Sequence, residues 1–424
     1  MLASFAFFFF VLSSYFILRP IRDVVAVAAG VRQLPWLFAG TLVAMLIANP
    51  LFSSLVARFP VRRFIPITYH FFAANLLVFY AVMRAGGGGL GSDWVGRIFY
   101  VWTSVFNLFV VSVFWSFMAD VFRSEQAKRL FGFIGVGGTL GSITGATVTA
   151  ALAQRLGTVN LLLVSVGLLE IAALIVVRFP ARPESRAKPQ LSPPSQEGAA
   201  IGGSMWAGFT GVIRSPYLVG IGLFQILYTI GSTFLYFEQA DIIGRSYESA
   251  SARAAILAEI EIAVQVFTVL TQIFLTGRLM RWLGLAVTLA ILPAISILGF
   301  GSLVLAPVLS TLVVFTVLRR GTNFGITNPA VEVLFTVVSR EDKYKAKNFI
   351  ETFVYRAGDQ VGAWSYRGLT VLGLGGGATA YAAVPFAAVW LAVGVWLGRR
   401  HARLAAHEAP RVAGSAVELK VASG

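Results

Sequence analysis

About twelve apolar stretches run along the chain, each near the roughly 20 residues that an α-helix needs to cross the hydrocarbon core of a membrane. Since 57% of the 424 residues are hydrophobic and only 12% are charged, a water-soluble domain could not bury this much apolar surface. The sequence therefore predicts an all-α membrane protein that crosses the bilayer many times. The predicted spans are residues 3–28, 34–56, 64–83, 94–118, 130–154, 160–177, 217–239, 254–276, 283–306, 308–338, 349–370 and 379–397.

The composition excludes several classes of function. The absence of cysteine rules out disulfides, thiolate metal sites and cysteine nucleophiles. The three histidines are scattered, and the sequence has no phosphate-loop, zinc-protease or nucleophile-elbow motif. We therefore expect no enzyme activity, no metal and no cofactor. The formal charge of +15 lies largely in short connectors between apolar stretches, which indicates membrane topology rather than a nucleic-acid partner.

The basic connectors alternate along the chain. Every second connector is rich in lysine and arginine, and the connectors between these are poorer in both. The positive-inside rule then places both termini and the longest connector in the cytoplasm, and we expect a bacterial inner membrane. The N-terminus has no basic lead and no small-residue cleavage site, so the first stretch is predicted to be an uncleaved helix. Its short lead-in suggests a start upstream of Met1.

Residues 179–214 form the one long connector rich in proline, serine and glycine, and they separate two blocks of six apolar stretches. The blocks share motifs: "FRSEQAKRLFGFIGVGG" resembles "SREDKYKAKNFIETFVYRAG", and "LFSSLVARFPVRRF" resembles "IFLTGRLMRWLG". Because both pairs fall at equivalent places, they indicate a parallel duplication of a six-helix unit. We therefore expect the twelve-helix major facilitator fold, with six-helix bundles at 1–178 and 215–400, a cytoplasmic linker at 179–214 and a cytoplasmic tail at 401–424.

The connectors after the second and eighth stretches carry basic residues at the place where the major facilitator fold has its cytoplasmic gating loop. The usual acidic member of that loop is missing, and Asp120, at the inner end of the fourth stretch, is the candidate partner of Arg62 or Arg63. The alternative is that these arginines only set the topology. The basic candidates for the gate are Arg58, Arg62, Arg63, Arg278 and Arg281.

Charged residues also interrupt the first apolar stretch. At the bilayer centre each costs about 2.5–3.5 kcal/mol on insertion scales, so such residues usually face a protein interior or a wet cavity. Arg19, Arg22 and Asp23 share one helical face, and Asp23 can pair with Arg19 one turn back. Pro20 removes a backbone donor and predicts a kink. The patch is a poor surface for lipid contact and a good surface for an aqueous cavity.

Charged residues also interrupt apolar stretches of the second block. Each possible ion pair among them has an alternative interpretation as an internal contact that fixes helix register. The excess of cations nevertheless favours an anionic substrate, because arginine binds phosphate and carboxylate in bidentate fashion. The candidate substrate-binding residues of this block are Arg319, Arg320, Asn323, Glu332, Arg356 and Asp359.

Other features of the apolar stretches have simpler interpretations. Glu238 and Asp241 end the seventh stretch, while Glu259 and Glu261 begin the eighth, so all four are expected at the membrane interface. The aromatic run at 5–10 is expected to face lipid. A glycine spacing of four residues, which is typical of close helix packing in membranes, occurs at Gly137, Gly141 and Gly145.

Several motifs resemble those of the ATP/ADP antiporter family, the nucleotide transporters of plastids and intracellular bacteria, within the major facilitator superfamily. "YFILRPIRDVVAV" resembles the first-helix motif of that family, with Arg22 and Asp23 at the place of a Lys-Asp pair. "FWSFMAD", "AKRLFGFIGVGGTLG" and "NPAVEVLFTVVSREDKYKAKNFIE" resemble further family segments. The resemblance implies a multi-pass antiporter of nucleotides. Motif positions in the last segment fall on Asn328, Pro329, Glu332, Lys347, Ile350 and Glu351.

The chain departs from this family at positions that bear on the substrate. The family's eleventh-helix motif keeps its arginine as Arg356, but its lysine is replaced by Asp359. A fourth-helix glutamate of the family is replaced near Thr103 and Ser104, and the acidic residue of its seventh helix has no clear match. These departures predict that the substrate of this chain differs from that of the family.

The sequence therefore predicts a secondary transporter of an anionic small molecule, such as a nucleotide or a related phosphate compound. One alternative is a proton-coupled transporter of another organic solute, with Asp23 or Asp359 as the titrating group. In either case the partners are the substrate, the lipid bilayer and a coupling proton or an exchanged counter-substrate. A second alternative is a membrane scaffold or sensor that transports nothing, which would gain nothing from intramembrane charges.

Overall fold

The computed structural model of the chain describes helices and the turns between them. Its backbone is described for residues 2–58, 61–86, 93–121, 124–179, 212, 215–338, 347, 349–374 and 378–422. Within these ranges, the side chains at 49–58, 61–64, 93, 116, 119–120, 124–132, 351–352, 378 and 407–422 are not described. The described ranges contain no strand, which confirms the all-α prediction.

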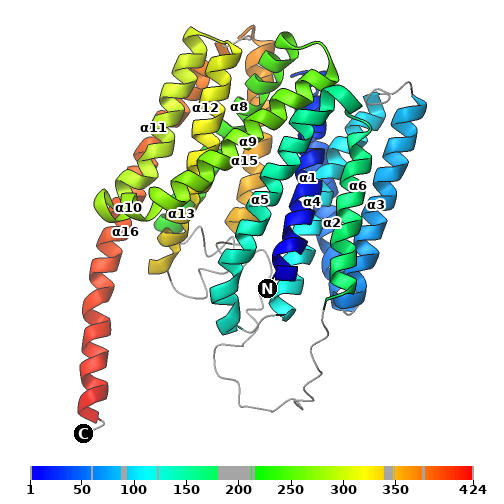
Figure 1. The fold of residues 1–424 in the computed structure, drawn as a ribbon. Coiled ribbons are helices and arrows are strands. Elements are labelled where there is room, and N and C mark those ends of the chain that lie inside the picture. Colours follow the sequence, from blue (N-terminus) through cyan, green and yellow to red (C-terminus); the bar gives the residue numbers. More distant parts are fainter. Residues whose placement is uncertain are drawn as a thin grey trace. The chain divides into compact units, whose positions relative to one another are not determined.

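Each helix that precedes the predicted linker corresponds to one predicted span. Helix α1 contacts α4, α5 and α6, and Figure 1 shows it (dark blue) among them, while α3 packs on α4 and α6. Helix α1 continues through Pro20 without a break in its helical backbone. The helices are α1 (Leu2–Ala29), α2 (Leu34–Arg58), α3 (Val61–Ala85), α4 (Asp93–Val121), α5 (Ser124–Leu156) and α6 (Leu161–Val177).

The helices after the predicted linker are more often interrupted. The span predicted at 308–338 is divided into four elements, and the span at 349–370 into two, with π-helical turns at η1 and η3. The elements are α8 (Pro216–Ser246), α9 (Ala250–Phe274), α10 (Thr276–Trp282), α11 (Gly284–Leu305), α12 (Leu309–Thr322), η1 (Asn323–Thr327), α13 (Asn328–Leu334), η2 (Phe335–Val337), η3 (Ile350–Val354), α15 (Tyr355–Val371) and α16 (Ala378–Ala422).

The chain divides into two compact units that do not coincide with the two halves of the sequence. Unit 1 contains Met1–Ser185 together with Phe237–Val266, and unit 2 contains Arg186–Tyr236 together with Phe267–Gly424. The end of α8 and the beginning of α9 therefore pack with the first six helices. Unit 1 thus includes the connector between α8 and α9, which the charge pattern predicts on the extracytoplasmic side. It also includes the ends of these two helices next to that connector.

Helix α1 approaches α5 so closely that only glycine fits at the contact. A Cβ atom added to Gly141 would overlap the backbone carbonyl of Phe9, and one added to Gly145 would overlap that of Ser13. The hydroxyl of Ser13 donates a hydrogen bond of 3.0 Å to the carbonyl of Gly141, which directly links the two helices. Helix packing therefore explains the glycine spacing, as the sequence predicted, because small residues allow backbones to approach within a membrane.

The aromatic run at the start of α1 is largely enclosed by protein, so the prediction that it faces lipid is wrong for its central residues. Phe7 is 0% exposed and Phe8 is 6% exposed. Phe8 stacks on Phe114 of α4 at 4.1 Å between ring centroids, and Phe7 lies 5.7 Å from the ring of Tyr69 in α3. The run is buried because α1 is surrounded by the other helices of unit 1, and a composition pattern carries no information about that position.

Unit 2 is organised around the contact between α11 and α16, which lie side by side in Figure 1. A Cβ atom on Gly398 of α16 would overlap the backbone of Ala286 in α11, so these helices also touch through a glycine. Trp390 of α16 is 1% exposed, and its ring lies 5.3 Å from that of Phe224 in α8. These residues belong to one apolar core that also includes Leu289 and Leu334.

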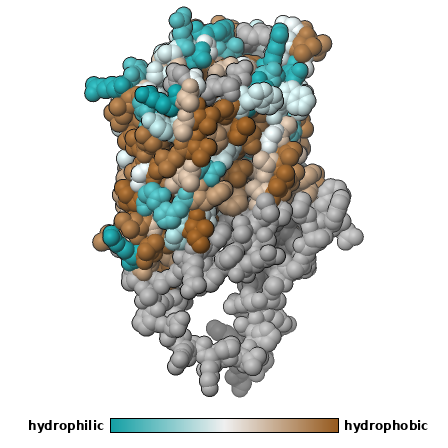
Figure 2. Space-filling model, turned by 90° about the vertical axis from the view of Figure 1, so that its right-hand side faces the viewer, coloured by the Kyte–Doolittle hydropathy of each residue, from teal (hydrophilic) through white to brown (hydrophobic). Residues whose placement is uncertain are grey.

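Eight helices among the described residues are long and apolar enough to cross a membrane, and two shorter apolar helices lie at 34–48 and 161–177. Large hydrophobic side chains are exposed on the outside of the helices, such as Leu298 at 74% and Leu305 at 86%. Figure 2 shows hydrophobic side chains over much of the described surface of one face. The chain is therefore a multi-pass membrane protein whose exposed apolar surface suits lipid contact.

Two predicted spans, the tenth and the eleventh, do not appear among these apolar helices, and both carry candidate site residues. The tenth span is broken at Asn323, directly after Arg319 and Arg320, and the eleventh begins with the π-helical η3 before Arg356 and Asp359. π-Helical turns inside helices occur frequently at functional sites. Interrupted, polar helices in a membrane protein need neighbouring protein or water to satisfy their backbone, so these spans do not suit lipid contact.

We expect Gly141→Ala to destabilise the protein by about 2 kcal/mol, because overpacking a close contact typically costs about 1–3 kcal/mol. Thermal unfolding of purified protein, followed by the fluorescence of its nine tryptophans, measures the effect. The control is Gly135→Ala in the same helix, where a new Cβ would have nothing within 4 Å. Equal unfolding temperatures for the two variants would show that the α1–α5 contact is looser than described.

Candidate functional site

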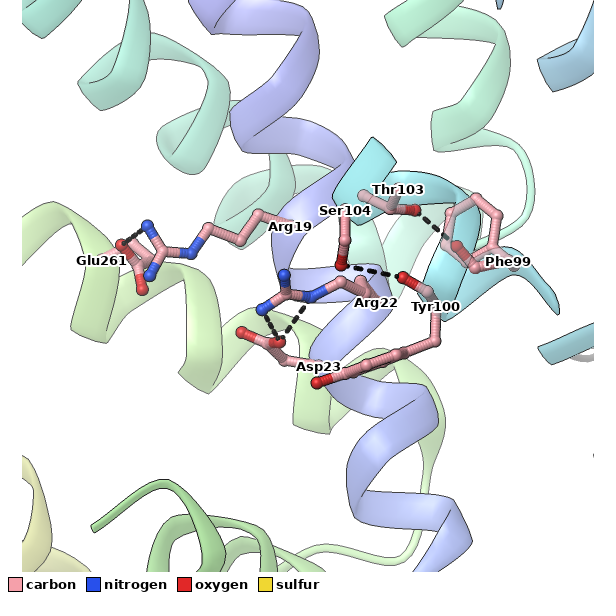
Figure 3. Close-up of polar contacts among 8 residues, drawn as sticks. All are labelled: Arg19, Arg22, Asp23, Phe99, Tyr100, Thr103, Ser104 and Glu261. Carbon is pink, nitrogen blue, oxygen red and sulfur yellow. Dashed lines mark hydrogen bonds and ion pairs between the residues drawn. The ribbon is translucent and has the colours of Figure 1, made fainter. Parts of the chain in front are cut away.

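The charged patch of α1 lies inside unit 1 (Figure 3). Arg22 donates from Nε and Nη2 to Oδ1 of Asp23, at 3.0 and 2.7 Å, and the Asp23 residue is 5% exposed. The guanidinium of Arg22 also lies over the ring of Tyr100 in α4, 5.1 Å from its centroid. A carboxylate and an aromatic face therefore orient this arginine, while 16% of its side chain stays exposed.

Arg19 forms its ion pair with Glu261 of α9 rather than with Asp23, so the predicted pairing within α1 is wrong. Nη1 of Arg19 lies 3.2 Å from Oε2 of Glu261, and the two side chains are 20% and 4% exposed. The guanidinium is also 5.5 Å from the ring of Phe16. Figure 3 shows the Arg19 side chain directed away from Asp23 and toward α9. The two arginines of the patch thus have different carboxylate partners.

Glu261, which was expected at the membrane interface, is enclosed by protein, with 4% of its side chain exposed. The predicted span began at 254, but α9 begins at Ala250, so Glu261 lies eleven residues into the helix, or about 16 Å at 1.5 Å per residue. Glu259 is exposed because it lies on the other side of α9, about 200° around the helix. Glu238 of α8 was also placed at the interface and is only 1% exposed.

The Arg19–Glu261 pair is one of several contacts in unit 1 between the two halves of the sequence. The ring of Phe38 in α2 lies 5.6 Å from that of Phe237 in α8. A Cβ atom on Gly244 of α8 would lie 3.3 Å from the side chain of Val27 in α1. Around the beginning of α9 and the end of α8, the first and second halves of the chain are therefore in direct contact.

Thr103 and Ser104 stand where the family resemblance has a glutamate. The hydroxyl of Thr103 donates to the carbonyl of Phe99 at 2.8 Å, and that of Ser104 donates to the carbonyl of Tyr100 at 3.2 Å (Figure 3). Both side chains are buried and bonded to their own helix one turn back. This part of α4 offers Arg22 the ring of Tyr100, whereas the resembled motif would offer a carboxylate.

Arg319 of α12 is enclosed by unit 2 and is 1% exposed. Its Nε donates to the hydroxyl of Ser296, Nη1 to that of Ser232, and Nη2 to the carbonyl of Tyr228, at 3.1, 2.9 and 3.0 Å. The guanidinium also lies 5.3 Å from the ring of Tyr228 and 5.9 Å from that of Trp390. Each nitrogen donates to a neutral oxygen, so this cation joins α8, α11 and α12 without a carboxylate among the described side chains.

The neighbours of Arg319 in the tenth span have different environments. Asn323 is 4% exposed and donates from Nδ2 to the hydroxyl of Tyr228 at 2.8 Å. Arg320 is half-buried. Glu332 of α13 is exposed and accepts hydrogen bonds of 2.7 and 2.8 Å from Nζ of Lys347. Both residues stand at motif positions of the resembled family. Glu332 therefore belongs to an exposed pair and lies apart from the buried Arg319 cluster.

Arg356 and Asp359 of α15 form the ion pair that their spacing predicts. Nη1 of Arg356 lies 3.3 Å from Oδ2 of Asp359, and the side chains are 36% and 14% exposed. Thr233 of α8 donates its hydroxyl to Oδ1 of Asp359 at 3.5 Å. A Cβ atom on Gly358 would be in close contact with Thr229, so α15 packs tightly on α8 beside the pair. Asp359 is the better buried member and has polar contacts from two helices.

The predicted gating residues do not form a described network. Arg278 and Arg281 are exposed in the short helix α10, where they donate to carbonyls four residues back, those of Phe274 at the end of α9 and of Gly277, at 3.1 and 3.2 Å. These bonds are local in the sequence. The side chains of the other candidates lie outside the described residues, and they are Arg58, Arg62, Arg63 and Asp120.

Sequence reasoning missed several residues of these clusters because they are uncharged or lie on other elements. Tyr100, Tyr228, Ser232 and Ser296 contact the arginines through rings and hydroxyls, and no local pattern distinguishes them from ordinary core residues. Among the described residues, no group of three or more histidine, aspartate or glutamate side chains is placed to hold a metal ion.

These observations define a class of protein. An all-helical membrane protein that keeps charged pairs inside both halves of a duplicated chain has the architecture of a membrane transporter. Residues 1–358 match the model of the Major Facilitator Superfamily, and the chain belongs to this family. The twelve-helix fold predicted from the repeats is thereby confirmed, and the family places the chain with transporters rather than enzymes.

Solved structures show the same fold. A bacterial homologue of the human lysosomal transporter Spinster, in an inward-facing and unoccupied conformation, aligns with a TM-score of 0.63 at 15% identity, over 95% of this chain and 97% of that one. The nucleoside transporter NupG aligns with a TM-score of 0.59 at 16% identity, over 94% of this chain and 97% of that one. At these identities the likeness concerns the fold alone.

Curated relatives are found among carriers of intracellular bacteria. ADP,ATP carrier protein 2 of Chlamydia pneumoniae is 23% identical over 357 residues, which are 73% of this chain and 66% of the carrier. ADP,ATP carrier protein 1 of Chlamydia trachomatis serovar D is 23% identical over 349 residues, which are 72% of this chain and 64% of the carrier. The chain thus spans slightly less than two thirds of the length of these relatives.

We expect Arg19→Met to destabilise the protein by about 3 kcal/mol, since removing one member of a buried ion pair leaves the other charge uncompensated. The charge-reversed double variant Arg19→Glu/Glu261→Arg should recover much of that loss, which thermal unfolding measures. Arg245→Met is the matched control, because its pair with Asp241 is exposed and exposed pairs contribute about 0–1 kcal/mol. Additive losses in the double variant would contradict the ion pair.

Proposed function

We propose that this protein is a secondary active transporter of an anionic small molecule, with a nucleotide or a related phosphate compound as the first candidate. The observation that carries the proposal is the Arg22 cluster, in which a partly exposed guanidinium lies over an aromatic ring and beside a buried carboxylate. Arginine binds phosphate in bidentate fashion, and the ring of Tyr100 orients this guanidinium. The ADP,ATP carriers named above support this choice of substrate class.

The proposed mechanism is alternating access between two six-helix bundles, 1–178 and 215–400, joined by a linker at 179–214. Contacts between the halves have to change when access alternates, and Arg19–Glu261 is such a contact. We infer that this pair breaks in one state of the cycle and forms in the other. The positive-inside pattern supports cytoplasmic termini and a cytoplasmic linker in a bacterial inner membrane.

Asp359 supports a second candidate function, a transporter in which a proton or another cation is coupled to the solute. It replaces a lysine of the resembled family and lies against Arg356 and Thr233, where proton uptake would weaken the ion pair. A carboxylate that alternates between an arginine and a proton can link protonation to a change in helix packing. The exchange of two anionic substrates needs no such group.

The substrate test begins with Arg22. We expect Arg22→Ala to lose at least about tenfold in nucleotide affinity, because a charge-assisted hydrogen bond contributes about 1.5–3 kcal/mol. Arg22→Lys should retain part of the affinity, since it keeps the charge but not the bidentate geometry. Thermal shift of purified protein with nucleotides and uptake into proteoliposomes are the measurements.

The control for this test is Arg84→Ala, which removes an exposed arginine at the end of α3. It should bind and transport like the unmodified protein. Undiminished ligand stabilisation and uptake by Arg22→Ala would mean that Arg22 is only a structural charge. The anionic-substrate proposal would then lose its main support.

The coupling test concerns Asp359. If this carboxylate takes up a proton during the cycle, Asp359→Asn should fold and bind substrate but lose accumulation driven by a pH gradient. Asp359→Lys, which restores the family pattern, should shift preference toward nucleotides. If the pair with Arg356 is only structural, each single alanine variant should be unstable and the double variant Arg356→Ala/Asp359→Ala should recover both stability and transport. Full transport by the double variant would exclude a coupling role.

A further inference from the structure

A groove of about 690 Å³ runs between α2 and α4 in unit 1, apart from the charged clusters. Its volume lies within the range of small-molecule sites, about 300–1,000 Å³. The residues along it recur at helical spacing, so the groove follows one face of each helix. They are Gln33, Trp36, Leu37, Gly40 and Ala44 on or just before α2, and Trp94, Arg97, Ile98, Val101, Trp102 and Val105 on α4.

The groove is polar at one end only. Gln33 and Arg97 lie near the ends at which α2 and α4 begin, together with Trp36 and Trp94. The side chains farther along both helices are apolar as far as Ala44 and Val105. A site with a cationic mouth and an apolar remainder suits an amphiphile rather than a fully polar solute.

The length of the groove corresponds to one leaflet of a bilayer. Eleven residues separate Gln33 from Ala44, and eleven separate Trp94 from Val105, which is about 16 Å along a helix. The hydrocarbon core is about 30 Å thick, so an acyl chain in one leaflet extends about 15 Å. An acyl chain that enters the groove at its polar end would therefore reach about the middle of the membrane at Ala44.

The mouth of the groove has the side chains found at a membrane interface. Trp36 and Trp94 are 57% and 70% exposed, and tryptophan concentrates at the level of lipid headgroups. The guanidinium of Arg97 lies 5.2 Å from the centroid of the Trp94 ring, which orients it at the entrance. An arginine in this position suits bidentate binding of a phosphate.

The floor of the groove is formed where α2 and α4 approach each other at small residues. A Cβ atom on Gly40 would lie 3.4 Å from Val101, so α2 and α4 nearly touch there. Trp102 forms an aromatic wall against α3, with its ring 5.3 Å from that of Phe79. Further along, the methyl group of Ala44 leaves space that a larger side chain would fill.

We propose that this groove binds one glycerophospholipid, with the anionic headgroup phosphate on Arg97 and an acyl chain along the apolar part toward Ala44. The lipid would be a resident of the α2–α4 surface and not the transported substrate, so this inference goes beyond the proposed function. A lipid that contacts both helices would stabilise their packing. In this proposal Arg97 selects the phosphate of the headgroup, and the length of the apolar part of the groove suits one acyl chain.

Native mass spectrometry of delipidated, full-length protein titrated with dioleoylphosphatidylglycerol tests the proposal. We expect one tightly bound lipid per chain, weakened at least about fivefold by Arg97→Gln, because a charge-assisted hydrogen bond is lost. Ala44→Phe should abolish tight binding by filling the groove. Dioleoylglycerol, which has the same chains without the phosphate, should bind the unmodified protein about as weakly as phosphatidylglycerol binds Arg97→Gln.

Two control variants match these changes elsewhere in the chain. Arg367→Gln alters an arginine that also lies over a tryptophan three residues earlier, at 5.4 Å from Trp364, but outside the groove. Leu298→Phe adds an aromatic ring at a position that is 74% exposed. Both should bind the lipid like the unmodified protein.

Equal lipid affinity in the unmodified protein, in Arg97→Gln and in Ala44→Phe would overturn the proposal. So would a loss of lipid affinity in the control variants as large as that in Arg97→Gln and Ala44→Phe. Displacement of the lipid by inorganic phosphate alone would also overturn it. Nucleotide stabilisation should persist in Arg97→Gln, which separates this site from the Arg22 cluster. Loss of nucleotide response in that variant, with lipid binding unchanged, would assign the groove to the substrate instead.

Discussion

The close approach of α1 to α5 is the contact on which the rest of unit 1 depends. Glycines at positions 141 and 145 bring the two backbones together, and the Ser13 hydroxyl joins them by a hydrogen bond. With α4 and α6 on its other sides, α1 is surrounded by protein along much of its length. That position shields its charged residues from lipid, where each would cost about 2.5–3.5 kcal/mol. A helix at the centre of a bundle can carry a binding site that a helix at the lipid surface cannot.

The charges inside the protein are arranged so that each has polar or aromatic neighbours. Arg19 and Arg22 have carboxylates on different helices, whereas the buried Arg319 is surrounded by hydroxyls, a carbonyl and two rings. These arrangements have different consequences for the proposed anionic substrate. Arg22 is partly exposed beside Tyr100, so an anion can compete with Asp23 for it. Arg319 is enclosed by neutral acceptors, and this environment suits a role in joining helices.

Pairing also explains polar residues that stand alone in the sequence. Glu170 is the one acid of its apolar span, and its carboxylate lies 2.8 Å from Nδ1 of His70 in α3. This pair is considerably exposed, with side-chain exposures of 57% for His70 and 41% for Glu170, in contrast to Arg19–Glu261. A glutamate can thus pair with a basic side chain on an exposed surface, as with His70, or at a buried contact between sequence halves, as with Arg19. Burial, rather than residue type, separates the two cases.

The sequence by itself determined the membrane class and the fold, because apolar length and duplicated motifs are local properties of a chain. It also predicted the Arg356–Asp359 pair, since two residues one turn apart on a helix necessarily meet. Only the tertiary structure decided that Arg19 pairs with Glu261, that Tyr100 lies against Arg22, and that the centre of the aromatic run of α1 is buried. Each of these depends on which face of one helix meets another helix far away in sequence. Helical periodicity shows which residues share a face, but the packing of whole helices determines what that face contacts.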